Sequence, residues 1–412
     1  MVGVAESMEC KEENSVALEI GPDFNHLLLD RFLNESEQGT FFVPIRTMFD
    51  LCKKGDLELL KAILSASKDK NPQDKCDSFL RNNTLLHVAA EKGHLDIVKI
   101  IIPLIDDKNP ARMENRFNDT PLHLAAYKGH LEVFKYIFGQ VQDKNPIGYW
   151  RGTPLYTAAR NGHLDIVKYL FAQDEVDKNP IGAYKGDTPL IAAARNGHLD
   201  VVKYLYAQDE VDKTKVNNGY SSLLITCTYD HPLHAAAYYG HLEVVMYLCS
   251  QMEDKNPKLD DDATPLHAAA EMGHLEVVIY LCGFIEDKNP KLKITNQTPL
   301  HLAAREGHTD VVKYLCSQVQ DKNPKGYCGV TPMHLAAIYG HTEVIKYLVT
   351  VIADKNPVVT DMPAVADELC HLLGRVCVRR LGLTGRWRGT PLDFAHLVRN
   401  TAMVDFLKDL NP

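Results

Sequence analysis

The chain has 412 residues, of which 45% are apolar and 24% are charged, a balance typical of soluble folded proteins and far from a disordered composition. Its 45 basic and 54 acidic side chains give a formal net charge of −9, which argues against a general role in binding nucleic acid. The first residues show no secretory signal, and no apolar run is long enough to cross a bilayer, so we expect no membrane contact either.

The ten cysteines are scattered along the chain without any C-x-x-C pair. Three of them, Cys249, Cys282 and Cys316, follow Tyr-Leu at the same place in successive repeats, where a small apolar core side chain is expected. With no disulfide framework and no signal, we expect a reducing compartment, the cytoplasm or the nucleus.

Residues 1–44 form an N-terminal segment outside the repeats described below. Its first 20 or so residues are acidic and poor in large apolar side chains, a composition that favours disorder. We therefore expect this segment to be partly disordered.

A repeat dominates the rest of the chain. Gly-His-Leu or Gly-His-Thr occurs eight times, with the histidine at His94, His130, His163, His198, His241, His274, His308 and His341. The differences between neighbours are 36, 33, 35, 43, 33, 34 and 33 residues. Such a period is typical of a solenoid in which each repeat is one supersecondary unit that contacts only its neighbours.

Each repeat predicts a pair of short helices. The consensus runs Thr-Pro-Leu-His-x-Ala-Ala-x-x-Gly-His-Leu-Glu-Val-Val-Lys-Tyr-Leu and then, after a spacer, Asp-Lys-Asn-Pro. Threonine is a good helix N-cap, proline is tolerated at the first helical position, and glycine supplies the left-handed residue that ends the first helix. The second helix has an apolar stripe such as Val311, Val312 and Leu315. Two residues before the threonine, Asp262, Asn296 and Gly329 are types that accept a positive φ, as a hairpin tip requires.

The pattern resembles the ankyrin repeat in its Thr-Pro-Leu-His, Ala-Ala and Gly-His motifs and in its length. The resemblance implies an all-α solenoid of helix-turn-helix units with β-hairpin loops, and a protein-binding module without chemistry of its own. The Asp-Lys-Asn-Pro segments stand where the family has Asp-Val-Asn-Ala, and we interpret them as a style of this chain rather than a site.

The array is expected to span residues 45–412 with degenerate copies at both ends. Residues 48–64 carry Gly55-Asp56 in place of Gly-His, and the last copy starts at Thr390; we interpret both as capping repeats. Two insertions, 222–230 and 362–385, break the period. Insertions in a solenoid map to loops, where binding functions often lie, although an error in the gene assembly would break the period in the same way.

The histidines and the motif content favour neither a metal nor an enzyme. Fourteen of the 18 histidines belong to the repeat framework, where we expect them to join the backbones of neighbouring repeats. No Cys/His ligand spacing, glycine-rich phosphate loop, G-x-S-x-G elbow or H-E-x-x-H motif is present. We therefore predict no metal, no cofactor and no catalytic residue.

In the ankyrin fold the two residues after Ala-Ala and the hairpin tips face one concave groove. Aromatic and arginine side chains at these places are the types that dominate protein interfaces. The predicted partner-binding residues are Arg116, Phe117, Tyr127, Tyr149, Trp150, Arg160, Tyr184, Lys185, Arg195, Tyr238, Tyr239, Met272, Tyr327 and Tyr339. The alternative for each is that it only packs on the next repeat.

The sequence thus predicts a monomeric, non-enzymatic scaffold or adaptor that binds a protein partner through the groove. Within the second insertion, Leu373, Cys377 and Leu381 have a spacing that looks like the elongin-binding half of a suppressor-of-cytokine-signalling box. This resemblance implies an alternative, the substrate receptor of a cullin-type ubiquitin ligase. A further alternative is the regulatory part of an enzyme or channel whose remainder is missing from this chain.

Overall fold

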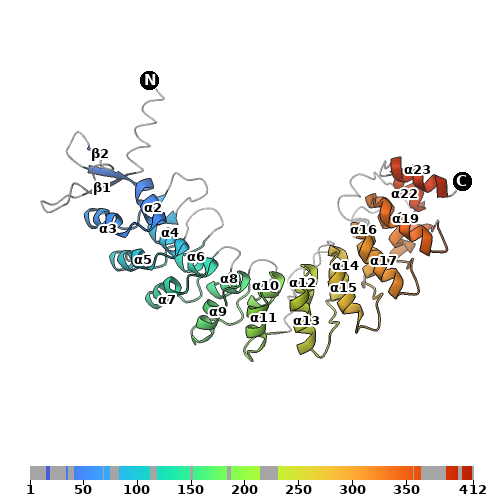
Figure 1. Cartoon of the computed structure of the whole chain (residues 1–412), viewed down its shortest axis with the longest axis horizontal. Helices are drawn as coiled ribbons and strands as arrows, with labels where there is room; N and C mark the ends of the chain where they lie inside the picture. The colour runs from blue at the N-terminus through green and yellow to red at the C-terminus, as the bar shows by residue number, and fades with distance from the viewer. Residues whose placement is uncertain are drawn as a thin grey trace, which may run out of the picture. The chain divides into compact units, whose positions relative to one another are not determined.

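A computed structural model describes residues 15–18, 34–35, 41–67, 69–74, 83–111, 118–148, 152–182, 187–213, 231–355, 357–362, 387–397 and 401–410. The chain divides into two units, Met1–Tyr184 and Lys185–Pro412. Within each unit, pairs of short helices follow one another in chain order, joined by loops (Figure 1). The predicted all-α solenoid of helix-turn-helix units is confirmed.

The described residues of the first unit include four helix pairs. Their first helices α2, α4, α6 and α8 pack in sequence, and the second helices α3, α5, α7 and α9 form a separate layer. The pairs are α2 (Ile45–Lys54) with α3 (Leu57–Ala66), α4 (Leu85–Lys92) with α5 (Leu95–Ile101) and the 3₁₀ turn η2 (Ile102–Leu104), α6 (Pro121–Lys128) with α7 (Leu131–Gln140), and α8 (Pro154–Arg160) with α9 (Leu164–Phe171).

The second unit repeats this arrangement. Its first helices stack in the order α10, α12, α14, α16, α18 and α22. The pairs are α10 (Pro189–Arg195) with α11 (Leu199–Tyr206), α12 (Pro232–Tyr238) with α13 (Leu242–Gln251), α14 (Pro265–Met272) with α15 (Leu275–Cys282), α16 (Pro299–Glu306) with α17 (Thr309–Gln318), α18 (Pro332–Tyr339) with α19 (Thr342–Val351), and α22 (Pro391–Leu397) with α23 (Thr401–Leu410).

Short antiparallel strands accompany the helices. In the N-terminal segment β1 (Ser15–Leu18) and β2 (Asn34–Glu35) both pair with β3 (Phe41–Pro44), in the order β1-β3-β2. The rest of that segment lies outside the described residues, so its expected disorder stays a prediction. The first hairpin pairs β4 (Gln73–Asp74) with β5 (Asn83–Thr84).

The second insertion begins and ends at a ladder. Strand β6 (Val359–Met362) pairs with β7 (Trp387–Gly389), with Met362 opposite Trp387, so the chain leaves and re-enters the fold at one place. Both insertions, 222–230 and 362–385, otherwise lie outside the described residues, apart from Met362. Their role stays a prediction.

The core lies between the two helix layers and consists of the repeat's apolar stripe. The alanines of the Ala-Ala pair, such as Ala269 and Ala303, are fully buried, because only a small side chain lets neighbouring first helices approach closely. The repeated cysteines are part of this core. Burial raises the pKa of Cys249 to about 12 and that of Cys282 to about 11, so both are inert apolar side chains at neutral pH.

The histidine of Thr-Pro-Leu-His joins two repeats through both ring nitrogens. In α16, Nδ1 of His301 accepts a hydrogen bond from the backbone N–H of Thr298 at 3.1 Å, which assigns the ring proton to Nε2. Nε2 of His301 then donates to the carbonyl of Val330 in the following repeat at 3.0 Å. His87, His123 and His267 make the same two bonds in their repeats. The expected framework role of these histidines is confirmed.

Contacts with the neighbouring repeats explain why glycine and histidine occur together in the Gly-His dipeptide. Nε2 of His130 lies 3.0 Å from the carbonyl of Glu91, in the repeat before it. The ring also covers Gly93, whose φ is +78°, and a Cβ built on that glycine would lie 2.6 Å from Nδ1 of His130. Glycine is therefore required twice, because its φ is positive and because the next histidine occupies the space of a side chain.

Aspartate replaces histidine in the first and last copies, on the side where the described residues include no further helix pair. Gly55 keeps its positive φ and contacts His94 of the next repeat, but Asp56 follows it and caps α3 by accepting from the N–H of Leu59 at 3.3 Å. In the last copy Asp393 accepts from the N–H of Thr390 at 2.8 Å. Asp393 keeps the bond to the threonine of its own repeat, Asp56 adds a helix cap that the histidines do not make, and both lack the N–H donor that would reach a neighbouring repeat.

The Asp-Lys-Asn-Pro segment ends one helix and starts the next. The ammonium of Lys144 donates to the carbonyls of Phe138 and Val141 at 2.6 and 2.8 Å, at the negative end of α7. The Oδ1 atom of Asp143 accepts from the N–H of Asn145 at 2.9 Å. In an earlier copy the Oδ1 of Asn109 accepts from the N–H of Leu122 in α6 at 3.2 Å. The lysine is therefore a helix cap.

The hairpin tips in the second unit have the predicted geometry. Asp262, Asn296 and Gly329 have φ values of 63°, 52° and 80°. Adjacent tips are joined by backbone hydrogen bonds, from the N–H of Lys293 to the carbonyl of Asp261 at 2.9 Å and from Tyr327 to Thr295 at 2.8 Å.

The glycine requirement can be tested by a matched pair of substitutions in one repeat neighbourhood. Gly93→Ala should lower the free energy of unfolding by about 1–3 kcal/mol, because alanine is strained at positive φ and collides with the His130 ring. Gly139→Ala, inside α7 with open space around the new Cβ, should raise that free energy by about 0.5–1 kcal/mol. Urea denaturation of both variants measures the difference, and a loss of equal size in both would contradict it.

The buried histidines predict a fall in stability at acidic pH. Burial lowers the pKa of His267, His301 and His334 from 6.5 to about 4 in the folded protein. Between these two values the unfolded chain binds protons that the folded chain does not, so stability is complete above pH 6.5 and is lost as the pH falls towards 4. The free energy of unfolding should change by at most about 1.4 kcal/mol per pH unit for each such histidine.

Urea denaturation at pH 7 and pH 5 measures this dependence. The variant His301→Gln should be less stable than the parent at pH 7 but should show a shallower pH dependence. A free energy of unfolding that is the same at both pH values would contradict the histidine assignment.

Candidate protein-binding surface

The surface that the sequence predicts lies at the C-terminal ends of the first helices. In the second unit the two residues after Ala-Ala differ sharply in exposure. The first of them is buried in three consecutive repeats, at Glu271, Arg305 and Ile338. The second is exposed at Tyr239 (46%) and Met272 (41%), and the Glu306 side chain is also exposed. We call Tyr239, Met272, Glu306 and Tyr339 the inner surface.

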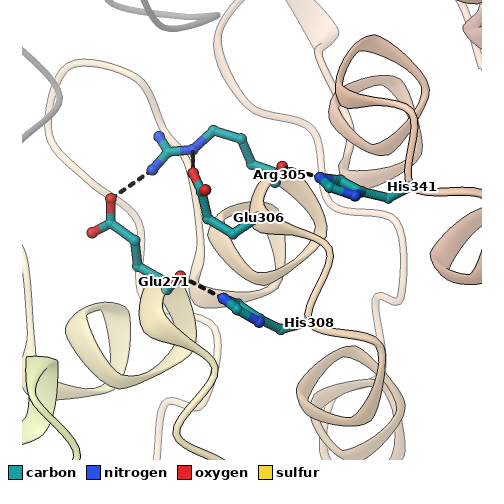
Figure 2. Close-up of polar contacts among 5 residues, drawn as sticks. All are labelled: Glu271, Arg305, Glu306, His308 and His341. Carbon is teal, nitrogen blue, oxygen red and sulfur yellow. Dashed lines mark hydrogen bonds and ion pairs between the residues drawn. The ribbon is translucent and has the colours of Figure 1, made fainter.

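A buried ion network fixes Glu271 and Arg305, each the first residue after Ala-Ala in its repeat (Figure 2). The Arg305 guanidinium lies 2.6 Å from Oε1 of Glu271 in the preceding repeat and 2.7 Å from Oε1 of Glu306. Burial alone would lower the pKa of Arg305, but the carboxylates of Glu271 and Glu306 have the larger effect and raise that pKa above its usual value. The guanidinium is therefore permanently charged. Arg305 thereby links α14 to α16.

The same helix ends accept the Gly-His histidines. Nε2 of His308 lies 3.0 Å from the carbonyl of Glu271, and Nε2 of His341 lies 2.7 Å from the carbonyl of Arg305 (Figure 2). Side chain and backbone of Glu271 and of Arg305 therefore both bond to a neighbouring repeat. The first residue after Ala-Ala therefore belongs to the repeat framework, and the exposed second residue is the one that a partner can contact.

Arg195, a predicted partner-binding residue, is already engaged within the second unit. Its guanidinium lies 2.8 Å from Oδ1 of the buried Asp187 and is 5.8 Å from the centre of the Tyr239 ring. A cation over an aromatic face stabilises the orientation of the ring. Arg195 is therefore better placed to position Tyr239 than to bind a partner charge by itself.

The remaining predicted residues of the second unit fall into two groups. Tyr238 is half-buried, its ring 5.1 Å from that of Tyr239, and Tyr339 is half-buried and stacks on His341 with 6.4 Å between ring centres. Tyr327 is exposed in the 3₁₀ turn η4 (Tyr327–Gly329) at a hairpin tip. Ile294, at the preceding hairpin, is exposed as well and was missed, because nothing in the motif marks a hairpin apolar residue as functional.

In the first unit only part of the prediction can be placed. Tyr127 is 47% exposed at the end of α6, with the ammonium of Lys128 4.9 Å from its ring centre. Arg160 is half-buried at the end of α8. Five predicted residues of this unit lie outside the described residues, namely Arg116, Phe117, Tyr149, Trp150 and Tyr184, and so does Lys185 of the second unit. Ile147 and Ile181, each just after an Asp-Lys-Asn-Pro segment, are exposed and were missed.

Two further findings concern the described residues only. They include no group of three or more His, Cys, Asp or Glu side chains arranged to hold a metal ion. Nor do they include a helix of the length and apolarity needed to cross a membrane.

The geometry defines a class of protein, a solenoid of helix pairs whose exposed residues vary on a repeated framework. A family model for ankyrin repeats matches residues 48–148, 139–218, 217–293 and 284–359, and the chain belongs to the ankyrin repeat family. Members of this family are in general non-catalytic protein-interaction modules, so protein partners are implied.

Among solved structures, the chain is similar to the crystal structure of the human ASB11 ankyrin repeat domain. The two share 24% sequence identity over 57% of this chain and 98% of that chain, with a TM-score of 0.48. No curated protein sequence matches the chain.

The ion network predicts an asymmetric response to mutation. Arg305→Met removes the guanidinium that neutralises the buried Glu271 carboxylate and should lower the free energy of unfolding by about 3–5 kcal/mol. Glu271→Leu should cost less, because Arg305 keeps Glu306. The double variant should recover most of the Arg305→Met loss, since apolar side chains often replace a buried ion pair without penalty. Strictly additive losses in chemical denaturation would show that the two residues do not interact.

Proposed function

We propose that this chain is a non-enzymatic scaffold or adaptor that binds a protein partner through the inner surface. The observation that carries the proposal is the exposure of Tyr239 and Met272 at equivalent places of adjacent repeats, beside positions that are locked into the framework. Stability does not require large apolar side chains there. Aromatic and methionine side chains are enriched at protein interfaces, where they supply contact area.

The charges around these residues suggest what the partner presents. Arg195 lies over Tyr239 at one end of the inner surface, and the exposed carboxylate of Glu306 lies two repeats further along. A partner segment with apolar anchors for Tyr239 and Met272 and a basic side chain near the exposed Glu306 carboxylate would complement it.

Oligomeric state, cellular location and ligands are part of the proposal. We propose a monomer in the cytoplasm or nucleus that needs no cofactor and binds no nucleic acid. The elongin-like spacing of Leu373, Cys377 and Leu381 lies outside the described residues, and no described contact favours the ligase-receptor alternative over the scaffold.

The test is a partner search followed by paired substitutions. Affinity purification of the full chain with mass spectrometry identifies partners, and the best is then purified. Tyr239→Ala and Met272→Ala should each weaken its binding by about 1–3 kcal/mol. Both should leave the melting temperature nearly unchanged, because exposed substitutions seldom exceed about 0.5 kcal/mol. Lys313→Ala, on the second helix α17, is the matched control and should bind like the parent.

The comparison also identifies a wrong surface. If both inner-surface variants bind like the parent while deletion of residues 362–385 abolishes binding, the inserted segment is the binding element and the proposal fails.

A further inference from the structure

The second helices carry a regular lysine that two repeats lack. The fifth residue of the second helix is lysine in six of the eight repeats with a Gly-His motif, namely Lys99, Lys135, Lys168, Lys203, Lys313 and Lys346. In the other two it is Met246, in α13, and Ile279, in α15. These repeats are consecutive, and α13 and α15 pack against each other.

The lysine has two structural roles where it is present. It pairs with the acidic residue three positions earlier, as Lys135 does with Glu132 at 2.9 Å and Lys346 with Glu343 at 2.7 Å. It also lies over the tyrosine of the following repeat, as Lys203 does at 5.8 Å from the centre of the Tyr247 ring. Met246 and Ile279 give up both interactions, so stability alone does not explain them.

The replacements create an exposed apolar patch. Met246 and Ile279 are 44% and 43% exposed, and Phe284 is 37% exposed just after α15. The Phe284 ring contacts Tyr280 edge-on, with 5.2 Å between ring centres, and the ammonium of Lys255 lies 5.5 Å from its centre. Three large apolar side chains on adjacent helices and the turn after them depart from the single exposed residues that any soluble protein shows. We call Met246, Ile279 and Phe284 the outer patch.

Two carboxylates beside the outer patch have lost their lysines. Glu243 and Glu276 occupy the place of Glu132 and Glu343, one turn before Met246 and Ile279, and both are exposed. No cationic side chain among the described residues lies within ion-pair distance of either one. The positive end of each helix explains why a carboxylate is favourable there. It does not explain why the cation has been replaced by an apolar side chain in both repeats.

We propose that the outer patch binds a second protein partner, through a basic amphipathic helix of that partner. The helix would place its apolar side on Met246, Ile279 and Phe284, and its lysine or arginine side chains would take the place of the missing lysines beside Glu243 and Glu276. The outer patch lies on the second helices and the inner surface on the ends of the first, so the two proposals are independent.

The experiment uses the full chain and two fluorescent synthetic peptides of about 18 residues, long enough to form a helix. Both have leucine on one face, with lysine on the other face in the first peptide and glutamate in the second. The parent protein should bind the lysine peptide at least about tenfold more tightly than the glutamate peptide. Fluorescence anisotropy measures both affinities.

Three double variants locate the binding. M246K/I279K restores the residue of the other six repeats; it should weaken the lysine peptide about tenfold without lowering the melting temperature. E243K/E276K should reverse the preference between the peptides. D310K/E343K, with the same charge change on α17 and α19, is the matched control and should bind like the parent.

Two results would overturn the proposal. The first is equal binding of the lysine peptide to the parent and to M246K/I279K, or no preference between the peptides. The second is self-association of the parent in sedimentation that M246K/I279K abolishes, which would make a second copy of this chain the occupant. Neither result bears on the Tyr239 and Met272 variants, so failure here leaves the inner surface untouched.

Discussion

Contact between a histidine ring and the backbone of the next or preceding repeat is the constraint on which the structure depends. A solenoid unit cannot bury its apolar face alone, so every repeat needs a specific joint to its neighbour. Here two imidazoles supply it, one from each half of the helix pair, such as His301 towards Val330 and His308 towards Glu271. The glycine of Gly-His, as at Gly93, Gly240 and Gly273, makes room for the histidine ring of the next repeat, which is why the dipeptide recurs as a unit.

This joint also decides which surface positions are free to vary. The carbonyl of the first residue after Ala-Ala accepts the neighbouring histidine, and in the repeats of Glu271 and Arg305 the side chain bonds across repeats too. The second residue after Ala-Ala makes neither of these hydrogen bonds. Variation at Tyr239, Met272 and Glu306 therefore leaves the array intact, and a partner-binding surface develops where the framework makes no demand.

The sequence predicts the fold almost completely, because every framework residue acts through a local rule that the period repeats. Helix starts, the alanine pairs and the positive φ at Asp262 and Gly329 all follow from residue type. The candidate surface is less predictable. Arg195 and Arg305 resemble interface residues in sequence, yet their guanidinium groups bond to Asp187 and to Glu271, and pairing across separate elements has no signature in a single motif.

The outer face shows how a repeat makes function visible without an alignment. Six lysines at one position set an internal standard: Lys135, Lys313 and Lys346 pair with an acid one turn earlier, and Lys203 lies over a ring in the next repeat. Against that standard Met246 and Ile279 make neither contact and leave two large apolar side chains exposed. A departure that occurs in two packed helices and that leaves both acids in place is best explained by a partner that supplies what the lysines did.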